Sequence, residues 1–186
     1  EFTGLAGNGY NKVIWNQIET EDFQYYSVYK NNLVLDYSIG TEYVDNNGPF
    51  NVGDTYYVTA SDFNGNESAP STTASYALNL MDIDLKWNLV SLSLGIDDPV
   101  YTELFSGSSE NSLYGFDDIY YLSEDLIPGN GYWLFFNSDS DPVVYGFGIN
   151  ELQITLLEGW NIIGGITGTI PLATVIDIDN IIVQNT

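Results

Sequence analysis

The chain has 186 residues, and 26 acidic residues against three lysines and no arginine give it a formal charge of −23 at pH 7. So few cations argue against binding to nucleic acid or to an anionic membrane surface, because both contacts depend on clustered Lys and Arg. The chain also has no Cys and no His, which excludes disulfides, thiolate chemistry, Ser-His-Asp catalysis and most zinc sites.

The rest of the composition favours strands and turns. Aromatic residues make up 15% of the chain, Tyr alone occurs 15 times, and Met occurs once. A hydrophobic content of 44% is enough for a packed core. No apolar run reaches the roughly 18 to 20 residues of a membrane span. We therefore expect a folded, all-β protein that does not insert into a membrane.

The first 77 residues show short alternating segments separated by turn signals. Apolar residues share one face in residues 12–16, 24–30 and 55–61, which is the period-two pattern of half-buried strands. Clusters of Gly and Asn at residues 7–9 and 64–66 are typical of the turns between such strands. The pattern predicts an antiparallel sandwich of about seven strands.

Three stretches of this region carry a family resemblance: Trp15 in an early strand, Tyr26–Lys30, and Thr55–Asp62 with the following 65–68. Together they resemble a bacterial fibronectin type III domain over residues 2–77. The resemblance implies an immunoglobulin-like sandwich with Trp15 as the core tryptophan of strand B and Tyr56 as the corner tyrosine of strand F. It also implies a spacer or binding module of a secreted protein. We place the boundary of this domain, residues 1–77, near Ala77.

The second region, residues 78–186, contains an internal echo. Residues 85–92 and 157–164 share a Trp-Asn pair, and residues 117–120 and 179–182 share an acidic-apolar pattern. The spacing predicts a β-rich module whose second copy is shorter. With the Gly-rich turn at 127–136, the echo resembles a β module of large bacterial surface and secreted proteins. That resemblance implies a second sandwich or barrel-like unit and an extracellular or cell-surface location.

Only two segments of the chain are candidates for helix. Val100–Phe105 and Leu172–Ile176 both begin directly after a Pro, which is common at the first turn of a helix. Each predicts one or two turns, too short to carry a function.

Two loops place oxygen-bearing side chains at alternate positions. One contains Asp62, Asn64 and Asn66, and the other contains Asp139 and Asp141. Calcium takes roughly six to eight oxygen ligands, so both loops are candidate calcium sites. The same residues also form ordinary Asx turns, which is the alternative interpretation. No other cofactor is indicated.

The carboxylates do not predict an enzyme. Glycoside hydrolysis needs two carboxyl groups that face each other across a cleft, and the acidic pairs of this chain lie mostly in turns beside Gly, Asn and Pro. No second catalytic motif accompanies them. We expect no catalytic site.

Aromatic residues are too numerous to be interior at every position of alternating strands. Trp15, Trp87 and Trp160 lie in strand-like segments and are predicted to be core residues. Tyr132 and Trp133, which follow a Gly turn, are the candidates for a ligand or interface surface. Exposed rings suit a protein interface and a sugar-binding platform alike.

These observations predict a non-catalytic structural or assembly module of a bacterial surface layer, filament or adhesin. Its partners would be copies of itself or other surface proteins, bound through strand edges or aromatic patches. Two alternatives stay open: a carbohydrate-binding module that takes a glycan, and a passive spacer of a secreted enzyme.

Overall fold

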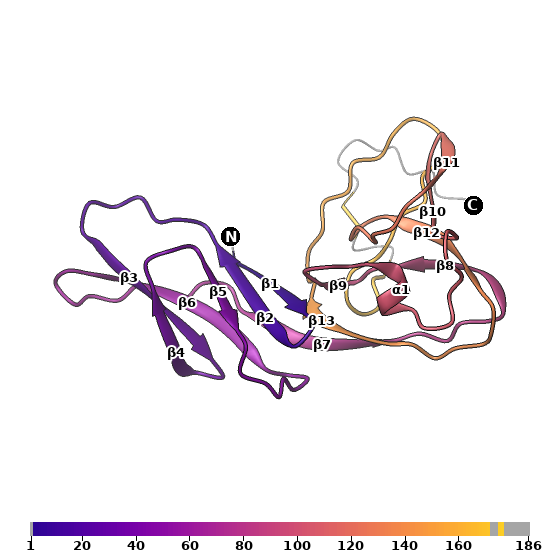
Figure 1. Cartoon of the computed structure of the whole chain (residues 1–186). Helices are drawn as coiled ribbons and strands as arrows, with labels where there is room; N and C mark the ends of the chain where they lie inside the picture. Colours follow the sequence, from indigo (N-terminus) through magenta and orange to yellow (C-terminus); the bar gives the residue numbers. More distant parts are fainter. Residues whose placement is uncertain (1, 172–174, 177–186) are drawn as a thin grey trace.

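The computed structural model describes residues 2–171 and 175–176, and the regular structure in this part of the chain is almost entirely antiparallel β (Figure 1). The predicted all-β class is confirmed. Helix α1 (Tyr101–Leu104) forms inside the predicted segment 100–105. The second predicted helix falls on residues 172–176, and 172–174 lie outside the described residues. None of the described residues belongs to a helix of the length and apolarity that a membrane span needs.

The first unit is a sandwich of two sheets. One sheet contains β1 (Phe2–Gly7), β2 (Tyr10–Trp15) and β5 (Glu42–Asp45) in the order β1-β2-β5. The opposite sheet contains β4 (Leu33–Ser38), β3 (Phe23–Lys30), β6 (Thr55–Asp62) and the start of β7 (Ala74–Leu80). Apolar residues of both sheets meet in one core, which includes Val13, Trp15, Tyr26, Val28, Tyr56 and Val58. The alternating pattern of the sequence thus predicted these strands correctly.

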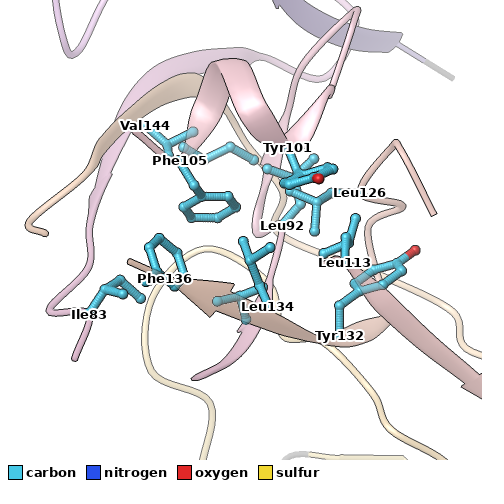
Figure 2. Packing of buried hydrophobic residues seen from close by; sticks show 12 residues of the cluster. Ile83, Leu92, Tyr101, Phe105, Leu113, Leu126, Tyr132, Leu134, Phe136 and Val144 are labelled. Atoms are coloured by element: carbon cyan, nitrogen blue, oxygen red, sulfur yellow. The ribbon is translucent and has the colours of Figure 1, made fainter. Parts of the chain in front are cut away.

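The second unit is built on a four-stranded sheet in the order β11-β10-β12-β8. Its strands are β8 (Lys86–Ser91), β10 (Tyr114–Asp117), β11 (Ile119–Leu122) and β12 (Gly131–Phe136). Alternate residues of β12 point toward a core that α1 covers, as Figure 2 shows for Tyr132, Leu134 and Phe136. The same core contains Ile83, Val90, Leu92, Leu94, Tyr101, Phe105, Leu113, Leu126 and Val144.

A shared strand joins the two units. β7 pairs with β6 through Ala74 and Ser75, and from Tyr76 onward it pairs with β13 (Val143–Gly148). β13 in turn pairs with β9 (Leu94–Gly95), so six strands from both units form one sheet. The predicted boundary at Ala77 therefore falls inside β7. Phe147 of β13 also packs into the core of the first unit.

Backbone segments approach one another very closely at this junction. A Cβ on Gly95 would lie 2.5 Å from the carbonyl oxygen of Gly4, and a Cβ on Gly146 would lie 2.9 Å from the carbonyl oxygen of Gly95. A side chain at either position would collide with the neighbouring backbone. Glycine is therefore what allows the first and second units to pack at this distance.

Asp97 adds polar contacts at the same junction. Its backbone N–H donates to the carbonyl oxygen of Ala6 at 2.9 Å, and its carboxylate pairs with the ammonium group of Lys12. The hydroxyl of Tyr10 donates to the same carboxylate at 2.6 Å. Burial opposes the charged form, but the bonds from Lys12 and Tyr10 outweigh it and hold the pKa of Asp97 below its usual value. Asp97 thus links the β1–β2 hairpin to the second unit.

Candidate interaction surface

The side of the four-stranded sheet that faces away from the second core carries a group of apolar side chains. They belong to strands β8, β10 and β12, and we call them the outer aromatic face: Trp87, Leu89, Tyr114, Trp133 and Phe135. The strand register places Trp87 opposite Phe135, and Leu89 and Tyr114 on either side of Trp133. Residues paired in this way have neighbouring side chains on one side of a sheet. The five side chains therefore form one continuous surface.

Ring contacts give this surface a defined shape. The Trp87 ring centroid lies 5.2 Å from that of Phe135 in an edge-to-face arrangement and 5.8 Å from that of Tyr114. Trp87 nevertheless remains 50% exposed, and Leu89 is 58% exposed. Large apolar side chains on one sheet face with this much exposure are typical of surfaces that bind another molecule.

A hydrogen-bonded turn positions Trp87 at the edge of this face. The amide of Asn88 reaches back across the preceding residues: its Nδ2 donates to the carbonyl oxygens of Asp84 at 2.7 Å and Lys86 at 3.3 Å. Its Oδ1 accepts the backbone N–H of Asp84 at 3.2 Å. Lys86 adopts a positive φ of 86° to close the turn. We call this arrangement the Asn-anchored turn.

The same turn occurs a second time. Nδ2 of Asn161 donates to the carbonyl oxygens of Leu157 at 2.9 Å and Gly159 at 3.2 Å, and its Oδ1 accepts the N–H of Leu157 at 3.0 Å. Gly159 has a φ of 100°, in the place of Lys86. The echo that the sequence shows around its two Trp-Asn pairs is therefore a repeated local structure, although the residues after Trp160 do not form a long strand.

Trp160 projects from the second turn and is 88% exposed. It borders a hollow of about 190 Å³, between the end of β10 and residues 154–163. Asp117, Asp118 and Tyr121 also line this hollow. The hollow exists because β10 and β12 pair only through Tyr114, and the backbone N–H of Gly131 instead donates to Ile162 at 3.0 Å.

The exposure of several aromatic residues differs from the sequence prediction. Trp15 is buried, as predicted, but the prediction that Trp87 and Trp160 are core residues is wrong, since both are exposed. Tyr132, a predicted surface residue, is fully buried, and its hydroxyl accepts the backbone N–H of Ile127 at 3.2 Å. Trp133 is half-buried, so it is the one of the two candidates that contributes to the outer aromatic face.

The first predicted calcium loop satisfies its carboxylate internally. Oδ1 of Asp62 accepts the backbone N–H groups of Asn64 at 2.9 Å and Asn66 at 2.8 Å, and Oδ2 accepts the side-chain amide of Asn66 at 2.7 Å. The bonds from Asn66 and Asn64 lower the pKa of Asp62. This is the geometry of an Asx turn, in which Asn66 presents nitrogen rather than oxygen to the carboxylate.

The second predicted loop also uses one of its carboxylates. Oδ1 of Asp139 accepts the backbone N–H of Leu85 at 2.7 Å, which ties the loop to the first Asn-anchored turn, while Asp141 is exposed. Across the described residues, no three carboxylates lie close enough together to hold a metal ion. Calcium binding at either loop stays a prediction.

The most buried charges of the chain lie at one end of the first core. Asp45 accepts bonds from Nζ of Lys30 at 3.1 Å, from the hydroxyl of Tyr56 at 2.8 Å and from the backbone N–H of Asn47 at 2.9 Å. Burial raises the pKa of Tyr56 to about 12, and its bond to Asp45 acts in the same direction. These groups satisfy one another inside the fold, so we assign the cluster to stability rather than to ligand binding.

Strand β11 is a free edge of the four-stranded sheet, next to the outer aromatic face. All four of its residues are exposed, and they include Ile119 and Tyr120 with exposed fractions of 73% and 58%. An exposed apolar edge strand is a template for pairing with another chain.

Comparison with family models, with curated proteins and with solved structures finds no match for this chain. The two resemblances drawn from the sequence therefore stay predictions. The geometry of the outer aromatic face, of Trp160 and of the β11 edge is the basis for any functional conclusion.

Proposed function

We propose that the chain is a non-catalytic module of an extracellular bacterial structure, such as a surface layer, a filament or an adhesin, and that it associates with copies of itself or with other surface proteins. The outer aromatic face carries this proposal. Trp87 and Leu89 lie half exposed or more on an edge strand, and Trp and Tyr side chains dominate the binding energy of many protein interfaces. The free β11 edge offers a second route to the same kind of contact.

The absence of catalytic chemistry supports the same proposal. The chain has no His and no Cys. A general acid needs a raised carboxyl pKa, whereas bonds to neighbouring groups lower the pKa of Glu67 as they do that of Asp62. The extracellular location is supported by the fibronectin type III resemblance, with which a sandwich of a three-stranded and a four-stranded sheet is compatible.

Carbohydrate binding is the competing function, and the hollow beside Trp160 favours it. An exposed indole next to Asp117 and Asp118 could stack on a sugar ring while the carboxylates accept hydroxyl protons. The outer aromatic face is less suited to a sugar, because Leu89 and Phe135 offer no hydrogen bond to hydroxyl groups. The larger exposed surface therefore favours a protein partner.

Light scattering over a range of protein concentrations tests self-association directly. We expect a mass above the 20.7 kDa of one chain, increasing with concentration. Association should strengthen with salt, because each copy carries a charge of −23 and about 0.1 M salt screens repulsion beyond roughly 10 Å. Parallel samples with calcium and with chelator show whether calcium bridges carboxylates between copies. A monomer under every condition would support the spacer function instead.

A further inference from the structure

We propose that Trp160 of one copy packs on the outer aromatic face of another copy, against Leu89 and Trp133. This inference rests on the self-association proposed above, and it names the two surfaces that meet. They are different surfaces of the same chain, so the contact can repeat from copy to copy, as the growth of a filament or a layer requires.

The two Asn-anchored turns provide the first argument. Both turns present an indole from the same hydrogen-bonded frame, but their surroundings differ. Trp87 in the first turn packs against the rings of Phe135 and Tyr114, whereas Trp160 has no aromatic neighbour among the described residues. The first turn thus shows that side chains from the outer face of this sheet are suited to cover an indole held in this way.

The second argument is the space that the outer aromatic face leaves open. Leu89 pairs in register with Trp133 next to Trp87, and its side chain is 58% exposed. An incoming indole can lie on Leu89 and meet the half-buried ring of Trp133 edge-to-face, an arrangement that aromatic pairs favour. Burying two large, exposed apolar groups against each other removes both from water.

Charge favours a second copy as the occupant. Glu158 lies two residues before Trp160, and Asp117 and Asp118 line the hollow beside it. Lys86, on the other surface, directly precedes Trp87 and is exposed. Lys12 and Lys30 are engaged in salt bridges, whereas Lys86 has no ion pair within the described part of the chain. The acidic rim of Trp160 is therefore complementary to the cation beside the outer aromatic face.

A pair of complementary variants tests the contact. Trp160→Ser removes the inserted ring, and Leu89→Glu places a charge on the receiving face. Both positions are exposed, so both variants should keep the wild-type melting temperature. Ile39→Glu is the matched control, because Ile39 is 84% exposed in the first unit and belongs to neither surface.

We expect the Trp160→Ser and Leu89→Glu variants each to weaken self-association at least about 30-fold in sedimentation equilibrium, and the Ile39→Glu control to associate like the wild type. An equimolar mixture of the two variants should recover a dimer, because the Leu89→Glu copy still has Trp160 and the Trp160→Ser copy still has an intact face.

Three results would overturn the inference. Either variant may not associate as the wild type does, the mixture must not stay monomeric, and a panel of soluble oligosaccharides must not quench Trp160 fluorescence in place of association. A wild-type protein that never associates would instead reject the proposed function, together with the inference that rests on it. The two failures are therefore distinguishable.

Discussion

Replacing Tyr56 with Phe tests the charged cluster of the first core. The Tyr56 ring is fully buried, and its hydroxyl donates to the carboxylate of Asp45, whose side chain is 1% exposed. Tyr56→Phe keeps the ring but removes one donor from a buried carboxylate. A hydrogen bond to a charged group contributes about 1.5 to 3 kcal/mol, so we expect the free energy of unfolding at pH 7 to fall by about 2 kcal/mol.

The pH dependence gives this prediction a second, independent part. Burial raises the pKa of Tyr56 to about 12 in the fold, against about 10 in the unfolded chain. A raised pKa contributes stability that is present below pH 10 and is lost as the pH rises toward 12. Two pKa units correspond to about 2.7 kcal/mol at most. The stability difference between wild type and Tyr56→Phe should therefore close between pH 10 and pH 12.

Urea denaturation followed by tryptophan fluorescence measures both parts. Tyr57→Phe is the control, because Tyr57 is the next residue of β6 and stacks on Tyr29 outside the core. It should change the free energy of unfolding by less than about 0.5 kcal/mol. A loss at pH 7 for Tyr56→Phe no larger than that of the control, or a difference that stays constant from pH 9 to pH 12, would refute the reasoning.

Three further substitutions test the junction and the repeated turn. Gly95→Ala should lower stability by about 1 to 3 kcal/mol, because its Cβ would meet the carbonyl oxygen of Gly4, while Gly165→Ala, which meets nothing within 4 Å, should leave the melting temperature unchanged. Phe147→Ala should cost about 3 to 5 kcal/mol in urea denaturation and split a single transition into two, since this side chain joins the first core to β13. Asn88→Ala removes three hydrogen bonds and should cost about 1 to 2 kcal/mol, measured by calorimetry, and equal stability would show that the turn does not need its anchor.

The strands of the first unit could be predicted because each carries its own period-two signal. Val13 and Trp15 of β2, and Tyr56 and Val58 of β6, alternate with more exposed residues and lie in the core as expected. Such a pattern is local, so it needs no knowledge of the partner strand. The same rule would have buried Tyr132 correctly, because it alternates with Leu134 and Phe136.

The orientation of β8 could not be predicted in the same way. Trp87 and Leu89 are apolar on one side of the strand, while Val90 and Leu92 are apolar on the other, so periodicity alone does not decide which side is buried. Long-range packing places Val90 and Leu92 in the core and leaves Trp87 outside. A strand with two apolar sides is consistent with an interface on the second side.

The junction was hidden from sequence analysis for a different reason. Pairing between β7 and β13 joins segments more than 60 residues apart, as in the register of Ala77 with Gly146, and no local signal specifies it. The hollow beside Trp160 likewise depends on where β10 and β12 separate. Turn-forming Gly and Asn residues could be identified from sequence, but the close backbone contacts of Gly95 and Gly146 depend on tertiary structure.

The continuity of β7 through both units has a mechanical consequence. In a row of domains joined by flexible linkers, a pulling force first straightens the linkers, and each domain then turns freely. In this chain the segment that leaves the first sandwich is already hydrogen-bonded to β13 along Tyr76–Leu80, so no slack separates the units. A tensile load along β7 would have to shear that ladder of bonds together. The pair should therefore behave as one stiff element that transmits both force and orientation from one end to the other.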